Sequence, residues 1–334
     1  MRRFSASGLI WALAIILPVV SLLSMTVGTV SISFSDLFAA DSRQTETILF
    51  DIRLPRILLA ICVGAVLSST GAVMQGLFRN PLADPSLIGV SSGASVGASL
   101  MIVAAGGFIQ SGALLGLSLV AVGAFVGGFV ATLLVYRLAT SGIGTSVTTM
   151  LLAGIAIAAI AGALNSLLSY FSDNDMLRQI SLWQMGNLSG ASWTKVTIMA
   201  SVALLLMSLF PRDSRALNAL LLGESEARHL GVDVQAVKRR LIILTALGVG
   251  VCVALAGLVG FVGLIIPHIV RLAIGPDHRW LIPASALAGA TLLVFADSLA
   301  RIVVIPAELP TGILTALLGA PFFVVLLLQQ RKQV

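Results

Sequence analysis

The chain has 334 residues, of which 58% are hydrophobic and only 10% are charged, and its mean hydropathy is +1.06. Soluble domains carry roughly 25% charged residues, so a chain with 20 basic and 14 acidic side chains cannot cover a surface of this size with charge. The composition excludes a water-soluble enzyme, a nucleic-acid-binding domain and a disordered chain, and it places most of the chain in lipid. The net charge of +6 is expected to reflect Lys and Arg kept in cytoplasmic loops.

Four long stretches contain no Asp, Glu, Lys or Arg, namely 85–136, 138–172, 241–270 and 309–330. Because about 20 apolar residues span a bilayer, the first stretch has room for two spans and each of the others for at least one. At the start of the chain, Met1-Arg2-Arg3 precedes an apolar run over 9–30. This run is too long for a signal-peptide core and lacks a clear A-x-A cleavage site. It is predicted to be an uncleaved first span with its basic end in the cytoplasm.

The apolar runs predict an all-α polytopic membrane protein with ten membrane segments, one of them short. These segments are 9–30, 57–78, 88–106, 112–136, 148–171, 194–210, 241–257, 260–270, 281–302 and 311–328. With the N-terminus inside, the inner loops hold more Lys and Arg than the outer loops, so both termini are predicted to be cytoplasmic. Many of the 32 glycines lie inside the spans, as expected where helices pack closely in lipid. No repeat or linker divides the chain, which predicts a single transmembrane domain over 1–334.

Ionisable residues are nearly absent from the predicted spans. Asp297 and Arg301 are the best candidates, and their spacing of four allows them to pair on one helix face. Because ion-driven carriers usually hold ionisable groups at mid-membrane, an ion-coupled carrier is a less favoured hypothesis. A channel is less favoured too, because no filter-like sequence stands out. No P-loop motif occurs, so ATP-driven transport would need a partner that hydrolyses ATP. The sequence contains no recognisable set of catalytic residues and no spacing typical of metal ligands. Cys62 and Cys252 are predicted to be small side chains in the core.

The longest predicted inner loop, over about 211–240, reads PRDSRALNALLLGESEARHLGVDVQAVKRR. Its first part has apolar residues at helical spacing, and Gly223 can end that helix in a left-handed conformation. Residues 224–230 form a second short helix, closed by Gly231. Two short amphipathic helices joined at a glycine predict a compact knob that can enter a groove on a partner and carry a rigid-body movement. An ordinary surface loop is the alternative.

Several motifs together resemble one family of membrane proteins. They are IRLPR at 52–56, GAVMQGLFRNPLADPSLIGVSSGA at 71–94, LLGESEARHLGV at 221–232, GFVGLIIPHIVRL at 260–272, DHRW at 277–280, FADSLAR at 295–301 and ELPTGILTALLGAPFF at 308–323. The combination resembles the vitamin B12, ferric-siderophore and haem permeases of ATP-binding-cassette importers, from about residue 50 to the C-terminus. This resemblance implies a type II importer permease with about ten transmembrane helices per subunit, in agreement with the segment count.

The resemblance also implies partners. Permeases of this family form dimers with one translocation path between the subunits, two cytoplasmic ATPase subunits bind ATP and Mg, and a periplasmic binding protein delivers the substrate. The chain is therefore expected to be a multi-pass homodimer in the bacterial inner membrane, in contact with lipid and with no nucleic-acid partner. It is expected to be a transport subunit and not an enzyme, with no cofactor or metal of its own, because the partner subunit hydrolyses ATP.

Three sets of residues match functional positions of the family. Docking of the binding protein is implied for Arg53, Arg56 and Arg301. Guanidinium forks suit carboxylates, and anchoring at the membrane interface is the alternative role. Contact with the ATPase is implied for Gly223, Glu224, Ala227, Arg228, Leu230 and Gly231. A cytoplasmic gate is implied for Thr145, Ser146 and Val147.

The cargo is the property that the sequence specifies least. The amino-acid sequence most resembles those of bacterial haem-importer permeases, so haem is the expected transported substrate. A ferric siderophore or cobalamin remains the alternative, because a path poor in charge suits any large, partly apolar chelate. The histidines do not discriminate, since His268 and His278 occupy motif positions in relatives with other cargo. Five methionines could offer thioethers to a porphyrin, although packing is their favoured role: Met74, Met101, Met150, Met176 and Met185.

Overall fold

The computed structural model describes residues 5–30, 32, 43–104, 114–142 and 144–331. Its helices group into two compact units, each built from separate stretches of the chain. The first unit comprises Met1–Ala72, Asn187–Ser214 and Val259–Val334, and the second comprises Val73–Gly186 and Arg215–Leu258. The basic residues Arg2 and Arg3, which helped to predict the orientation, lie outside the described residues. That the chain forms a single domain stays a prediction.

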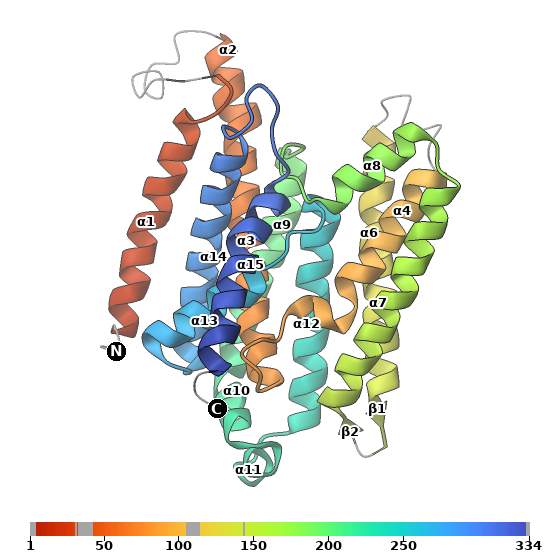
Figure 1. Ribbon diagram of the computed structural model, residues 1–334. Helices are drawn as coiled ribbons and strands as arrows, with labels where there is room; N and C mark the ends of the chain where they lie inside the picture. Colours follow the sequence, from red (N-terminus) through yellow and green to blue (C-terminus); the bar gives the residue numbers. More distant parts are fainter. Residues whose placement is uncertain (1–4, 31, 33–42, 105–113, 143, 332–334) are drawn as a thin grey trace. The chain divides into compact units, whose positions relative to one another are not determined.

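The first unit is a helical bundle around α14. It holds α1 (Ala6–Thr26), α2 (Arg43–Glu46), the π-helix η1 (Thr47–Arg53), most of α3 (Leu54–Leu77), α9 (Trp193–Leu209), the 3₁₀ turn η3 (Phe210–Asp213), α13 (Val262–Ile274), α14 (His278–Ala300) and α15 (Thr311–Arg331). Within it α14 packs against α1, α13 and α15 (Figure 1). A Cβ added to Gly64 of α3 would overlap the backbone of Gly289 in α14, so small residues allow these two helices to meet at backbone distance.

The second unit is built around α4. It holds η2 (Pro85–Ile88), α4 (Val90–Ala104), α6 (Leu114–Ala139), β1 (Thr140–Ser141), β2 (Gly144–Thr145), α7 (Val147–Tyr170), α8 (Asn174–Gln184), all but the first residue of α10 (Ser214–Leu222), α11 (Glu224–His229) and α12 (Val234–Ala256). Here α4 packs against α6, α7 and α12. Gly97 of α4 faces Gly123 of α6, where a Cβ on either residue would clash with the other helix. Glycine packing was predicted from the sequence and is confirmed at Gly123, whereas Gly162 has nothing within 4 Å of an added Cβ.

Each of the ten predicted segments overlaps a helix in the described part of the chain, and residues 105–106 and 112–113, at the ends of two segments, lie outside that part. In the described part of the chain, seven helices are long and apolar enough to cross a membrane, and three shorter apolar helices correspond to α4, α13 and α15. The only strands among the described residues are β1 and β2, an antiparallel pair with two residues in each strand. The all-α polytopic fold is therefore confirmed.

Three features differ from the sequence-based expectation. The helix that contains 57–78 continues backwards through η1 to Arg43. An amphipathic helix, α8, lies between α7 and α9, where no element was expected. The loop predicted to end at about residue 240 ends instead at Asp233, whose side chain caps α12 by accepting from the Ala236 N–H at 3.0 Å. The predicted span began only at residue 241, because the charged residues before it were assigned to the loop. Lys238 is nevertheless buried within α12, where its ammonium is bonded to Glu224.

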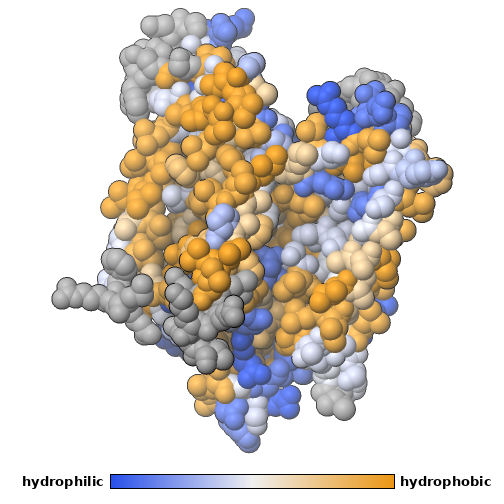
Figure 2. All heavy atoms as spheres, in the orientation of Figure 1, coloured by the Kyte–Doolittle hydropathy of each residue, from blue (hydrophilic) through white to orange (hydrophobic). Residues whose placement is uncertain are grey.

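The exposed surface of α1 is strongly apolar. Trp11 is 69% exposed and Ile15 is 66% exposed, and hydrophobic residues cover this helix in Figure 2. Large exposed apolar surfaces are rare on soluble monomers, so this helix is suited to contact with lipid. The end of the second unit that carries α11 is mostly hydrophilic in the same view.

Candidate functional site

The first candidate site is a buried cluster of charges in the first unit, which we call the arginine cluster. Its members are Arg53, Arg56, Asp297, Arg301 and Glu308. Arg53 ends η1, Arg56 lies in the first turn of α3, and Arg301 directly follows α14. The three arginines are only 5%, 4% and 3% exposed, respectively. Buried guanidiniums require partners, and each of these arginines finds them within its own chain.

Arg56 binds two carboxylates at once. Its Nε donates to Asp297 Oδ2 at 2.9 Å and its Nη2 donates to Asp297 Oδ1 at 3.0 Å, which is a two-pronged pairing. Its Nη1 donates to Glu308 Oε2 at 2.7 Å. The Thr311 hydroxyl also donates to Asp297 Oδ1 at 2.9 Å. Arg56 and Asp297 therefore tie α3 to α14, and Thr311 adds the start of α15.

Arg53 and Arg301 hold the end of α1. The two terminal nitrogens of Arg53 donate to the carbonyls of Met25 and Val30. Arg301 donates to the Val27 carbonyl at 3.1 Å and to the Ser24 hydroxyl. Because these acceptors lie on the last turn of α1 or just after it, the two arginines fix where α1 ends against η1 and α14.

Arg301 also meets the carboxylate predicted from its sequence spacing. Its Nε lies 3.4 Å from Asp297 Oδ2, which confirms the pairing expected at a spacing of four.

The arginine cluster leaves a small open space beside it. A pocket of about 140 Å³ is lined by its three arginines, by Glu308 and by residues of the α1 end and η1, including Gly28 and Ile48. Three guanidiniums face two carboxylates, so the cluster has one positive charge in excess. Such a space can admit one more acidic group. Sequence reasoning found the arginines but not the role of Glu308, although that residue opens the motif ELPTG.

The second candidate site is the helical knob formed by α10, Gly223 and α11. Leu217 and Leu220 of α10 are buried, which confirms the predicted apolar face. Gly223 has φ 132° and ψ 157°, so the positive φ that favours glycine is confirmed but the left-handed helical turn is not. Gly231, at φ 83°, follows the second helix as predicted.

The knob offers some of its predicted contact residues to a partner and buries others. Leu230 is 64% exposed, and the Arg228 side chain is 59% exposed. Ala227 is fully buried, so it supports α11 from inside and offers no surface. Glu224 is intermediate, with its side chain 30% exposed. Contact of these residues with an ATPase stays a prediction.

The predicted gate residues lie at the start of α7. Thr145 belongs to β2, Ser146 caps α7 by accepting from the Thr149 N–H at 3.3 Å, and Val147 is the first helical residue. The Thr145 carbonyl accepts from Lys238 Nζ at 2.8 Å. The same ammonium donates to Glu224 Oε1 at 2.6 Å. A predicted gate residue and a predicted coupling residue therefore share one buried partner that sequence reasoning missed.

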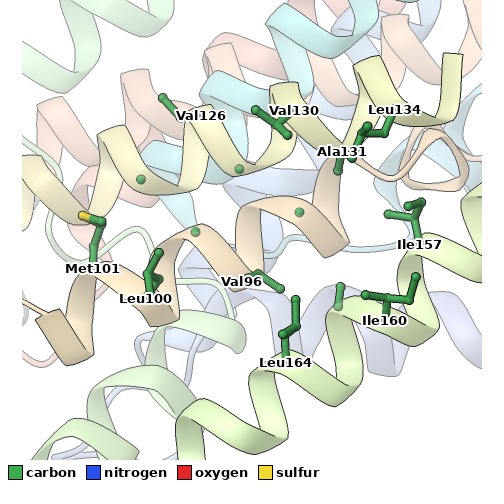
Figure 3. Close-up of a pocket in the computed structure, with 15 residues that line it drawn as sticks. Val96, Leu100, Met101, Val126, Val130, Ala131, Leu134, Ile157, Ile160 and Leu164 are labelled. Atoms are coloured by element: carbon green, nitrogen blue, oxygen red, sulfur yellow. The ribbon is translucent and has the colours of Figure 1, made fainter. Parts of the chain in front are cut away.

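An apolar groove lies between α4, α6 and α7 (Figure 3). Its volume is about 350 Å³, and every lining residue is glycine, alanine, a larger aliphatic residue or Met101. Met101 also packs against Gly123, so packing accounts for its position. Among the described residues, no group of three or more His, Cys, Asp and Glu side chains could hold a metal ion.

The chain is similar in sequence to known transport proteins. The sequence matches the FecCD transport family over residues 16–329. It is 46% identical over 322 residues to the hemin transport system permease protein HmuU of Yersinia pestis, with 96% of this chain and 95% of that protein covered. It is 42% identical over 320 residues to the vitamin B12 import system permease protein BtuC of Shigella boydii, with 96% and 94% covered.

Two solved structures have the same fold. One is an inward-facing ABC transporter assigned to the metal-chelate type, with a TM-score of 0.86 and 35% identity over 97% of this chain and 99% of that chain. The other is PsaBC of Streptococcus pneumoniae in complex with Fab, with a TM-score of 0.59 and 21% identity over 84% and 92% of the two chains. At that identity the second likeness concerns the fold alone.

Proposed function

Because the chain belongs to the FecCD transport family, we propose that it is the membrane-spanning permease subunit of an ATP-driven importer for haem. The observation that carries the cargo is the 46% identity to the hemin permease of Yersinia pestis over almost the whole of both chains. The bundle itself suits transport of a large chelate driven by partners, since the buried arginines and Asp297 are held by bonds within the chain near helix ends. In this proposal haem is the transported substrate and not a resident cofactor.

The proposed machine contains two copies of this chain, two ATPase subunits that bind ATP and Mg, and a periplasmic binding protein. It resides in the inner membrane with both termini in the cytoplasm. The knob is the proposed ATPase contact, because Arg228 of α11 and Leu230 directly after it expose side chains that a partner groove can take up. ATP-driven closure of the ATPase pair would then displace the knob and switch the path between outward and inward access.

The arginine cluster is the proposed docking point for the binding protein. A carboxylate of that protein can enter the pocket of about 140 Å³ beside Arg53 and Arg301, where the excess positive charge favours it. Because all three arginines are buried and already bonded, we propose that they act as a fixed positive socket and do not swing outward.

Cobalamin is the second candidate cargo, supported by 42% identity to the vitamin B12 permease of Shigella boydii. A cobalamin permease of Halobacterium salinarum is 45% identical, but over only 84% of this chain and 73% of that protein. A ferric siderophore remains the third possibility, as the metal-chelate transporter with the same fold illustrates.

The discriminating experiment measures ATP hydrolysis by the complete complex in liposomes. The cognate binding protein is added empty, loaded with haem, loaded with cobalamin or loaded with a ferric siderophore. We expect haem-loaded protein to give the strongest stimulation over the empty form. Stimulation by cobalamin or by a siderophore, with none by haem, would reassign the cargo while leaving the importer intact.

A further inference from the structure

Lys238 is a buried lysine at the beginning of a long apolar helix. It lies in the second turn of α12 and is only 1% exposed. A buried ammonium is strongly disfavoured unless it is paired and hydrogen-bonded. Both conditions are met, because Nζ donates to the Glu224 carboxylate at 2.6 Å and to the Thr145 carbonyl at 2.8 Å.

Gln235 gives α12 a second hold on Thr145. It lies three residues before Lys238, on the same helix face, and its Oε1 accepts from the Thr145 N–H at 3.0 Å. Both backbone polar groups of Thr145 are therefore bonded to side chains of α12. Thr145 in turn contacts Thr140 across the β1–β2 hairpin, where their hydroxyls lie 3.0 Å apart.

The hairpin leads directly into α7. Ser146, the next residue, is the N-cap of that helix, and its N–H donates to the Ala139 carbonyl at 2.9 Å. A two-stranded hairpin of this size is at best marginally stable alone. Its position, and the position of the first turn of α7, therefore depend on the grip of α12 on Thr145.

The knob depends on the same ammonium. Glu224 is the first residue of α11, a helix of six residues, which is too short to hold its place by its own hydrogen bonds. The other Glu224 oxygen lies 3.9 Å from the Arg228 guanidinium, a long pairing with an exposed side chain that contributes little. The strong fixed contact of Glu224 is thus the charge-assisted hydrogen bond from Lys238.

We propose that Lys238 is a positioning residue that links the knob to the β1–β2 hairpin, so that displacement of α11 moves the hairpin and the start of α7. The proposal rests on the proposed function for its role in transport, but the link itself is a property of this chain. The buried ammonium of Lys238 is bonded both to α11, through Glu224, and to the hairpin, through Thr145. Because the ammonium is buried, little water is available to replace either bond. A movement of the Glu224 carboxylate must therefore carry the ammonium with it or break the bond, and either event changes the hold on Thr145.

A distance measurement tests the link without any partner. Nitroxide labels are placed at Gly142→Cys in the hairpin and Ser225→Cys in α11, in a chain with Cys62→Ala and Cys252→Ala. An added Cβ at Gly142 meets open space, and Ser225 is exposed. Labelled chain is assembled with an excess of unlabelled chain so that each labelled copy is measured alone.

With Lys238 present, we expect one narrow distance distribution by pulsed electron resonance, and with Lys238→Met a broad one. The matched control is Arg239→Met, which removes the neighbouring exposed cation and should keep the narrow distribution. An equally narrow distribution in the Lys238→Met variant would overturn the proposal. If that variant does not assemble, Lys238→Gln replaces it, because its amide keeps a hydrogen-bond donor at the buried site but carries no charge to pair with Glu224, and the same two results decide.

Reconstituted complexes then separate this proposal from the proposed function. We expect the Lys238→Met complex to hydrolyse ATP but to move much less haem for each ATP, with the ratio unchanged in Arg239→Met and largely restored in Lys238→Arg. An unchanged ratio in Lys238→Met, in a system where the wild type transports haem, would overturn the link alone. Absence of ATP-driven uptake in the wild type would overturn the proposed function instead, and the label distances would still decide the link.

Discussion

Arg56 donates hydrogen bonds to Asp297 and Glu308 while remaining 4% exposed. The two carboxylates differ in their surroundings, since the Asp297 side chain is 1% exposed and that of Glu308 is 32% exposed. Breaking a buried pair leaves an uncompensated charge, whereas a solvated pair contributes little. Asp297 is therefore the member of the arginine cluster on which local stability depends.

We predict that Asp297→Asn destabilises the protein by about 3–5 kcal/mol, the usual cost of breaking a buried pair. Glu308→Gln should cost about 1 kcal/mol or less, as expected for a partly solvated pair. Unfolding of the purified chain in detergent, followed by heat or denaturant, measures both. Equal losses for the two variants would contradict the assignment of Asp297 as the buried counter-ion.

Gly223 adopts a conformation that side chains rarely take. At φ 132° the backbone favours glycine, and an added Cβ would also overlap the Glu226 carboxylate. We predict that Gly223→Val leaves membrane insertion intact but uncouples uptake from ATP hydrolysis, because the strain is roughly 1–3 kcal/mol and falls on the knob. Gly260→Val, where an added Cβ meets open space, serves as the control. Uptake at the wild-type level in Gly223→Val would contradict the knob geometry.

Individual contacts were predictable where they are local in sequence. The pairing of Asp297 with Arg301 follows from a spacing of four. The pairing of Asp297 with Arg56 joins residues 241 positions apart, and no periodicity reports on such a contact. The contact of Lys238 with Thr145 was missed for the same reason, since the two residues are 93 positions apart.

The end of α1 is held by two of the arginines that are proposed to dock the binding protein. Its carbonyls at Met25, Val27 and Val30 are all bonded to Arg53 or Arg301. The arginines proposed to meet the binding protein therefore also hold a helix end. A charge reversal there would test docking and folding together, so a milder substitution is needed.

We predict that Arg53→Gln weakens binding-protein docking several-fold at low salt and less at high salt, because it removes the excess positive charge of the arginine cluster, whose attraction for an acidic partner is screened by salt. Arg53→Lys keeps the charge and should retain most of the affinity. Surface plasmon resonance with the complex in nanodiscs measures both, and thermal unfolding reports whether the end of α1 stays in place. Equal affinities for the Gln and Lys variants at low salt would favour simple interface anchoring.

The helices themselves followed closely from the sequence. Each of the ten apolar runs contains a helix among its described residues, because lipid leaves the backbone no other way to satisfy its polar groups within one segment. The amphipathic helix α8 was missed because its mixed polarity resembles a loop between two spans. The start of α12 was missed because a charged side chain was taken as the end of a span.

Across the chain, scarcity of charge is the property that links sequence to function. Most of the described charges that are buried lie in the arginine cluster of the first unit and around Lys238 in the second, and Asp213 is a further buried charge. Both groups are hydrogen-bonded by partners within the chain and lie near helix ends, and neither resembles an ion-binding site at mid-membrane. Power supplied by a separate ATPase is the mechanism that this pattern favours.

Haem uptake into proteoliposomes that contain the purified chain, with and without its ATPase, tests whether this chain transports haem by ATP hydrolysis on a partner. We expect uptake from the loaded binding protein only when the ATPase and ATP are both present, and loss of uptake when ATP is replaced by a non-hydrolysable analogue. Haem uptake by the chain alone, driven by a proton or sodium gradient, would show instead that it is an ion-coupled carrier.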